Sequence, residues 1–312
     1  MTRIFWDYTV AFYLFSAGVS AGALIVAIVA DLIGKGRYAH IVRMGAWVAP
    51  VPVTLGTLAL VFDLERPYYF WRLMISLEPT SVMSIGAWIL LFFTFASVIF
   101  VYPYLPERYD ILKIRQKTSQ ISSTKAFRII SLILAMSTAL YTGVLLNLLV
   151  ARPLWNTPLL PLIFLFSAII DGIAAILIML YVIRHKSLGQ DEFMSSRKFL
   201  ERFDLLFLVP FIVSVAGMMA WLYLSGGHGA KALSIITGGS FAITFWLGVV
   251  IIGMLVPLAY DLRMMSGRHG QEETEGNKRL IALSVASSVL IGGFLLRYVL
   301  LYAGQLTGPI IN

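Results

Sequence analysis

Two charged residues interrupt otherwise apolar stretches of the sequence, and they are the positions best placed to do chemistry. Asp171 lies in LFSAIIDGIAAIL and Arg297 lies in FLLRYVL. An ionisable side chain in the hydrocarbon core of a membrane costs about 2.5–3.5 kcal/mol on insertion scales, so it is a functional candidate. Three interpretations are open: a proton relay or polar cavity built on both residues, a buried structural ion pair, or an Arg297 side chain that snorkels outward.

A second group of polar residues lies between two apolar stretches, where DLERPYYFWR (63–72) is followed by PTSVMSIGAW (79–88). Charged residues of both signs, among them Asp63, Arg66 and Arg72, stand here beside Tyr, Phe and Trp. One interpretation is an interfacial loop that local ion pairs hold in place. The other is a docking platform for a soluble partner, with polar groups that hold the head of a ligand.

The elements that position these residues are apolar helices. Of the 312 residues, 59% are hydrophobic and only 13% are charged, against about 25% charged in soluble domains, which excludes a soluble globular enzyme. We predict an all-α integral membrane protein, one polytopic domain over 1–312 with halves at about 1–105 and 125–312. Eight stretches reach the roughly 20 apolar residues that a membrane-spanning helix needs: 8–33, 41–62, 82–102, 128–151, 158–183, 203–224, 236–260 and 280–303.

The distribution of Lys and Arg predicts the orientation. Of the 24 basic residues, 18 lie in the connections around 34–43, 103–128, 184–202 and 261–279, and 5 lie in the N-terminus and the other connections. Basic loops stay in the cytoplasm. We therefore expect both termini and the 63–81 segment outside the cytoplasm, and we assign the net charge of +8 to membrane topology. A nucleic-acid partner is not expected.

The residue types exclude several kinds of redox centre. The chain has no Cys, and therefore no thiolate metal site or iron–sulfur cluster of its own. Its four His residues fall at span ends or in loops, where they cannot hold a haem between helices: His40, His185, His228 and His269. No Lys lies inside a predicted span, which excludes a Schiff base there. We expect no metal and no haem in this chain.

Four segments together resemble one membrane-protein family. DLERPYYFW followed by PTSVMSIGAW is similar to the signature of the NrfD/PsrC family, the quinone-handling membrane subunits of polysulfide reductase-like enzymes. LYTGVLLNLL and RPLWNTPLLPLIFLFSAI resemble the family's fourth and fifth helices, and FWDYTVAFYLFSAGVSAGA resembles its first. The resemblance covers most of the chain and is strongest over residues 5–175.

The resemblance implies a specific architecture and role. Members of the family have two four-helix bundles and carry no cofactor of their own. They bind menaquinone or ubiquinone near the outer face of the inner membrane. They exchange electrons with a four-cluster ferredoxin-like iron–sulfur subunit, which relays them to a molybdopterin catalytic subunit. The chain is accordingly expected to be non-catalytic by itself.

The resemblance also implies roles for individual residues. Tyr141, in YTGVLL, matches the family tyrosine that donates a hydrogen bond to a quinone carbonyl. Tyr13 occupies the place where some relatives have a His that contacts the quinone. Asp63 is expected to exchange the proton that accompanies quinone chemistry. Arg66 is expected to fix that carboxylate or to contact the iron–sulfur subunit, and Arg72 to dock the partner or fix the loop.

Two other functions remain open at this point. A secondary transporter or proton channel would use Asp171 and Arg297 as a site at the middle of the membrane. A purely structural anchor would bind no quinone. Binding of quinone, and its loss when Tyr141 is changed to Phe, discriminates the quinone-linked subunit from both.

Overall fold

The regular structure is entirely helical. The computed structural model describes residues 6–34, 36–63, 67–69, 71, 78–110, 113–183, 190–265 and 275–307, and no strand occurs within these ranges. Eight helices among them are long and apolar enough to cross a membrane. The predicted all-α fold and the predicted number of spans are thereby confirmed.

The eight spans are built from ten helical segments, because two of the spans change helix type or axis along their length. Six spans are single helices: α1 (Tyr8–Gly34), α5 (Val82–Val101), α7 (Lys125–Asn147), α8 (Leu160–Ile183), α9 (Gln190–Leu224) and α12 (Glu275–Leu306). The other two are α2 (Ala39–Val48) with α3 (Pro50–Asp63), and the π-helix η4 (Thr244–Leu255) with α11 (Val256–Met265). Short helices connect them: η1 (Pro67–Tyr69), η2 (Tyr102–Tyr104), η3 (Glu107–Tyr109), α6 (Arg115–Ser123) and α10 (Gly227–Thr237).

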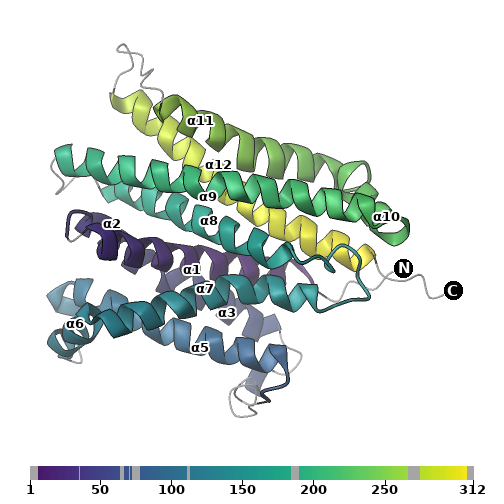
Figure 1. Ribbon diagram of the computed structural model, residues 1–312. Coiled ribbons are helices and arrows are strands. Elements are labelled where there is room, and N and C mark those ends of the chain that lie inside the picture. Colours follow the sequence, from purple (N-terminus) through teal and green to yellow (C-terminus); the bar gives the residue numbers. More distant parts are fainter. Residues whose placement is uncertain are drawn as a thin grey trace.

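The helices lie side by side, so the molecule has two distinct ends (Figure 1). We call the end that holds the start of α1, α10 and the end of α12 the terminal end. Trp6 and Gln305 join the two termini there: the Trp6 N–H donates to Oε1 of Gln305 at 2.9 Å, and Nε2 of Gln305 donates to the Trp6 carbonyl at 2.8 Å. The opposite end, with α6 and the start of α9, is called the basic end.

The helices α1 and α8 form the centre of the molecule. Each packs against the other and against α2, α7 and α12. They touch through small residues: a Cβ added to Gly22 of α1 would overlap the Ala168 carbonyl of α8, and one added to Gly172 of α8 would overlap the backbone of Gly22. Small residues allow this backbone approach between membrane helices. The crossing holds Asp171, the neighbour of Gly172, inside the molecule.

This crossing leads to a stability prediction. We expect Gly22→Ala to lower the stability by about 1–3 kcal/mol, because the added methyl group meets backbone atoms that cannot rotate away. The measurement is unfolding of the purified protein in detergent. Gly276→Ala is the control, since nothing lies within 4 Å of a Cβ at that position. Equal stability of the two variants would contradict the assignment of the crossing as a tight contact.

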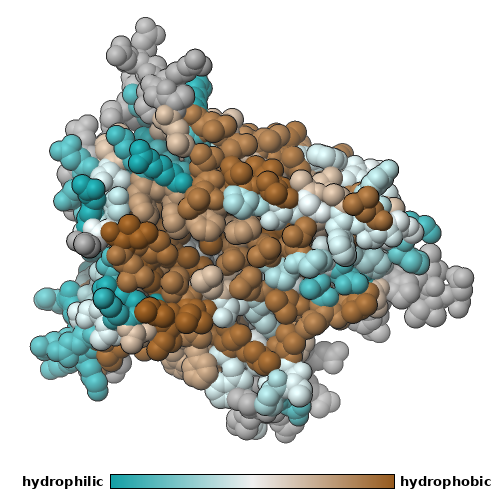
Figure 2. Space-filling model, in the orientation of Figure 1, coloured by the Kyte–Doolittle hydropathy of each residue, from teal (hydrophilic) through white to brown (hydrophobic). Residues whose placement is uncertain are grey.

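The surface between the two ends is apolar. Figure 2 shows hydrophobic residues across the middle of the visible face and hydrophilic residues at the basic end. Many of the large side chains in this band are well exposed, such as Leu206, Val213 and Ile291. In water such a surface is rare on a monomer. Its presence here fits helices that face lipid.

Three predicted boundaries are wrong. Residues 190–202, which the sequence predicts to be a polar connection, form the first turns of α9. Residue 236 belongs to α10, and the seventh span begins only at Thr244 and continues to Met265. The charged residues that suggested a connection between 184 and 202 include buried ones that pair with one another inside the helix bundle, so their polarity did not mark a loop.

The second span is broken at Ala49, between α2 and α3. Pro50 is the first residue of α3, a position that proline tolerates because the first helical N–H groups have no partner within the helix. The Val53 N–H in that first turn donates to Oγ of Ser20 on α1 at 2.8 Å. Ser20 of α1 therefore gives a backbone N–H beside the break its hydrogen-bond partner, as backbone polar groups in a membrane require.

Candidate functional site

Asp171 and Arg297 form a buried ion pair between α8 and α12. Nη1 of Arg297 donates to Oδ2 of Asp171 at 2.9 Å, to Oγ of Ser167 at 3.0 Å and to the Gly293 carbonyl at 2.8 Å. The two charged residues are each only 1% exposed. Of the interpretations offered by the sequence, the ion pair is observed, and the snorkelling arginine is wrong. The helix crossing keeps the guanidinium inside the molecule.

The surroundings of Arg297 are shaped to accept a guanidinium group. A Cβ at Gly18 would lie 2.5 Å from Nη2, and one at Gly293 would overlap the Asp171 carboxylate. The rings of Phe15 and Phe164 each have their centroid 5.6 Å from Cζ, which is within the range of a cation–π contact. Nε and Nη2 of Arg297 are buried and have no hydrogen-bond partner among the described residues. Such donors in a native protein are usually met by water.

Tyr13 lies on α1 and Tyr141 lies on α7, two helices that pack against each other, with α3 packed on α1 and α5 packed on α7. Tyr13 is buried, and Tyr141 is half-buried. A Cβ at Gly86 would overlap the ring of Tyr141, so the glycine lets this ring lie directly on α5. The two residues that the resemblance assigns to a quinone thus lie on neighbouring helices, and a glycine of the 79–88 motif positions one of them.

Two buried polar atoms on the neighbouring helices lack partners. Oγ1 of Thr57 on α3 and Nε1 of Trp88 on α5 make no hydrogen bond with the described residues. They are one and two residues from Gly56 and Gly86, the glycines that adjoin Tyr13 and Tyr141, and residues at these spacings point to other sides of a helix. Both atoms are donors that a bound carbonyl group could satisfy. Neither residue was assigned to the site from the sequence, because only packing shows that these groups are left without partners.

The charged candidates of the 63–81 segment are not tested by the structure. Asp63 is the last residue of α3, but its side chain lies outside the described atoms, and Arg66 and Arg72 lie outside the described residues. The end of the segment is described: the hydroxyl of Ser81 accepts from the Ser84 N–H at 3.4 Å and caps α5. Roles for Asp63, Arg66 and Arg72 therefore stay predictions.

The RPLW motif links the two termini at the terminal end. Nη1 of Arg152 donates to the Gln305 carbonyl. Nε1 of Trp155 donates to the Leu300 carbonyl at 2.7 Å, and its ring stacks on Trp6 with 5.5 Å between centroids. The motif that resembles the family's fifth helix thus holds the start of α1 against the end of α12. It is a structural contact between segments distant in sequence.

A further polar cluster lies at the basic end, and it was not predicted from the sequence. Arg197, Glu201 and Asp204 of α9 and Asp261 of α11 are all more than nine-tenths buried. Their signal in the sequence was the spacing of residues 197, 201 and 204, which places three charges on one helix face. Because the sequence predicts residues 184–202 to be a connection, a shared helix face for these residues was not expected.

The helices and the buried pair define a multi-pass helical membrane protein. Comparison with known proteins gives the family. The family model described as "Polysulphide reductase, NrfD" matches residues 1–309, and the protein belongs to this family of integral membrane subunits of respiratory oxidoreductases.

Several curated relatives agree with this assignment. The "Protein NrfD homolog" of Haemophilus influenzae is 33% identical over 98% of this chain and 96% of its own length. The C subunit of the polysulfide reductase of Wolinella succinogenes is 32% identical, over 97% of this chain and 95% of its own length. The "Hdr-like menaquinol oxidoreductase integral membrane subunit" of Archaeoglobus fulgidus is 23% identical, over 85% of this chain and 66% of its own length.

Proposed function

We propose that the protein is the quinone-binding membrane subunit of a respiratory oxidoreductase and that it exchanges electrons between menaquinone or ubiquinone and an iron–sulfur partner subunit. The observation that carries the proposal is the placement of Tyr13 and Tyr141 on α1 and α7, two helices that pack against each other. The name of the Archaeoglobus relative, a menaquinol oxidoreductase subunit, favours menaquinone.

The residues present fit a quinone head group. Its two carbonyl oxygens need hydrogen-bond donors, and the hydroxyl groups of Tyr13 and Tyr141 are such donors. A bound quinone supplies the capacity to carry two electrons, whereas this protein binds and orients the ring and holds the hydrogen bonds to its oxygens. The exposed apolar side chains of α3 and α5, such as Leu55, Leu58 and Ile85, offer an isoprenoid tail a path from lipid.

The proposal includes an orientation in the inner membrane. Since 18 of the 24 Lys and Arg lie in 34–43, 103–128, 184–202 and 261–279, the segments where the spans reach the basic end, we infer that this end faces the cytoplasm. The terminal end and the 63–81 segment would then face the other side, where Arg66 and Arg72 would dock a four-cluster ferredoxin-like subunit that passes electrons to a molybdopterin catalytic subunit. The eight spans would divide into two four-helix bundles.

The Asp171–Arg297 pair adds a proton relay to the proposal. The pair is buried between α8 and α12, and two of the guanidinium donors have no partner within the described part of the protein. An ionised pair without full compensation inside a membrane is expensive, and this cost supports a role beyond packing. The same pair is what a transporter or proton channel would use, and that function is the alternative.

The test is quinone binding by the purified protein. We expect quinone to be extracted with the protein from its native membrane, and added menaquinone to quench the fluorescence of the protein's seven tryptophans in a saturable way. Quenching by a saturated isoprenoid alcohol of similar length is the control for non-specific partition. A protein that carries no quinone and shows no saturable quenching would contradict the proposal and favour the transporter.

A further inference from the structure

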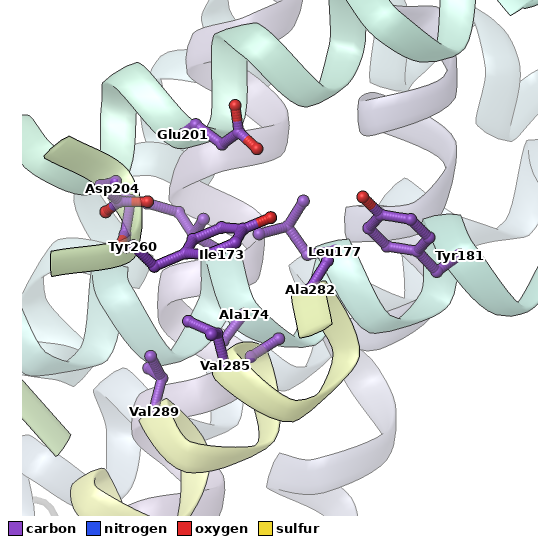
Figure 3. A pocket seen from close by; sticks show the side chains of 12 residues that line it. Ile173, Ala174, Leu177, Tyr181, Glu201, Asp204, Tyr260, Ala282, Val285 and Val289 are labelled. Atoms are coloured by element: carbon purple, nitrogen blue, oxygen red, sulfur yellow. The ribbon is translucent and has the colours of Figure 1, made fainter. Parts of the chain in front are cut away.

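A second group of buried charges lies at the basic end, apart from the Asp171–Arg297 pair. Arg197, Glu201 and Asp204 come from one face of α9, and Tyr260 and Asp261 come from α11 (Figure 3 shows Glu201, Asp204 and Tyr260). No part of the proposed quinone site uses them. Three carboxyl groups and one guanidinium share this buried space, so the group would carry excess negative charge if every carboxyl were ionised.

Arg197, the single cation of the group, forms an ion pair with Glu201. Nε of Arg197 donates to Oε1 of Glu201 at 2.6 Å, and Nη2 donates to the Tyr260 hydroxyl at 3.0 Å. Asp204 and Asp261 instead line one cavity between α9 and α11, and each is more than nine-tenths buried. Within the described part of the chain, no Lys or Arg lies at salt-bridge distance from either.

The shared burial of Asp204 and Asp261 favours a proton on one of them. Oδ2 of Asp261 is buried and meets no protein donor among the described residues, and the residue is 4% exposed. Ionising both carboxyl groups beside one buried cavity without a cation is costly, so one of them holds a proton. The geometry thus describes a pair of carboxyl groups that holds a proton which it can release.

A cavity adjoins this pair. Its polar side is formed by Tyr181, Glu201, Asp204, Tyr260 and Asp261, and its other walls are apolar side chains of α8 and α12, including Leu177, Val285 and Val289 (Figure 3). The centre of a water molecule can reach about 20 Å³ of it, which is room for one ordered water. The space is too small for an organic solute. No three His, Asp or Glu side chains in the described residues are arranged to hold a metal ion.

The cavity reaches toward the Asp171–Arg297 pair. A second, smaller space is lined by Asp171, Ser167 and Gly293, and Val289 lines both spaces. Asp204 lies within electrostatic range of Asp171. One valine side chain therefore borders both the water-sized cavity at the basic end and the buried ion pair.

We propose that Asp204, Asp261 and the adjoining cavity form a proton-holding site that exchanges protons between the basic end and the Asp171–Arg297 pair. An O–H bond forms at a carboxylate oxygen of Asp204 or Asp261 as an O–H bond of hydronium breaks. The proton then passes through a water in the cavity to Asp171, and no electron moves. The proposal rests on the proposed quinone function for the use of these protons, but not for their binding.

Infrared spectroscopy of the full-length protein in lipid nanodiscs tests proton binding without quinone turnover. We expect a carbonyl-stretching band of a protonated carboxyl group near neutral pH, sensitive to deuterium. Asp204→Asn and Asp261→Asn should each reduce it. Asp191→Asn, which changes an exposed carboxylate of the same helix, should leave it intact. A wild-type protein without such a band, or one whose band persists in both variants, would overturn the proposal.

Proton counting with the whole complex in liposomes tests the transfer. With quinol as the electron donor, we expect the Asp204→Asn/Asp261→Asn variant to take up protons from the basic-end side at least about tenfold more slowly. Val289→Leu, which fills the space between the cavities, should act in the same direction, and Asp191→Asn should not. Unchanged uptake in the first two variants would refute the proposal. Failure of the wild-type protein to bind quinone would instead refute the proposed function and leave the infrared result standing.

Discussion

Tyr141→Phe should weaken quinone binding by about 5- to 150-fold. The substitution removes one hydroxyl group from a ring that lies on Gly86 and leaves the packing of that ring unchanged. When a quinone carbonyl in a buried site loses its hydrogen-bond donor, the binding free energy becomes less favourable by about 1–3 kcal/mol. This loss corresponds to the stated range of affinity. The measurement is the dissociation constant of menaquinone from the purified protein, followed through tryptophan fluorescence.

Tyr223→Phe is the matched control for this prediction. Tyr223 lies near the end of α9 and is well exposed, so removing its hydroxyl group should leave quinone affinity unchanged. Tyr13→Phe should weaken binding in the same direction as Tyr141→Phe. If the Tyr141 and Tyr223 variants bind quinone equally well, the tyrosine pair does not form the site, and Trp88 and Thr57 become the remaining donors to test.

Arg297→Met should destabilise the protein by about 3–5 kcal/mol. Asp171 would then be left as a buried carboxyl group without its cation, and removal of one partner of a buried pair has this cost. Thermal or detergent-induced unfolding of the purified protein measures it. Asp31 and Arg128 offer an internal comparison, since they form a pair of the same types at 2.8 Å with both side chains partly exposed. Arg128→Met should cost only about 0–1 kcal/mol.

The double variant Asp171→Leu/Arg297→Met separates a structural role from a proton relay. Replacing both partners by apolar residues should recover most of the lost stability, because no unpaired charge remains. If the pair is a relay, the folded double variant still loses proton-coupled turnover in liposomes. Asp171→Asn with normal turnover and an unchanged number of protons per electron pair would remove the relay from the proposal.

The architecture could be predicted from hydropathy because lipid imposes a simple requirement. A spanning segment must be long, apolar and internally hydrogen-bonded, and eight segments meet that requirement in sequence and in structure. The boundaries were less accurate where the protein departs from the pattern. The start of α9 is polar and yet helical, and two of its charges, Arg197 and Glu201, are buried as a pair. The seventh span begins with the π-helical η4, after a turn that the hydropathy of the sequence does not reveal.

The candidate site was predictable only where motif or hydropathy marks a residue. Tyr13 and Tyr141 were assigned by resemblance, and Asp171 and Arg297 stood out as charges in apolar stretches. That these two charges pair with each other depends on how α8 meets α12, which no local pattern reveals. Thr57 and Trp88 became candidates only because packing leaves their polar atoms without partners. Asp204 and Asp261 lie on different helices and meet only in the folded protein.

The direct backbone contact between Gly22 and Gly172 limits how α1 and α8 can move against each other. A transporter that alternates its access must swing one half against the other. Here such a swing would separate two central helices at the place where no side chain stands between them to take up the displacement. We therefore expect α1 and α8 to keep their relative positions during turnover. Proton and electron transfer would then need no large rearrangement of these helices.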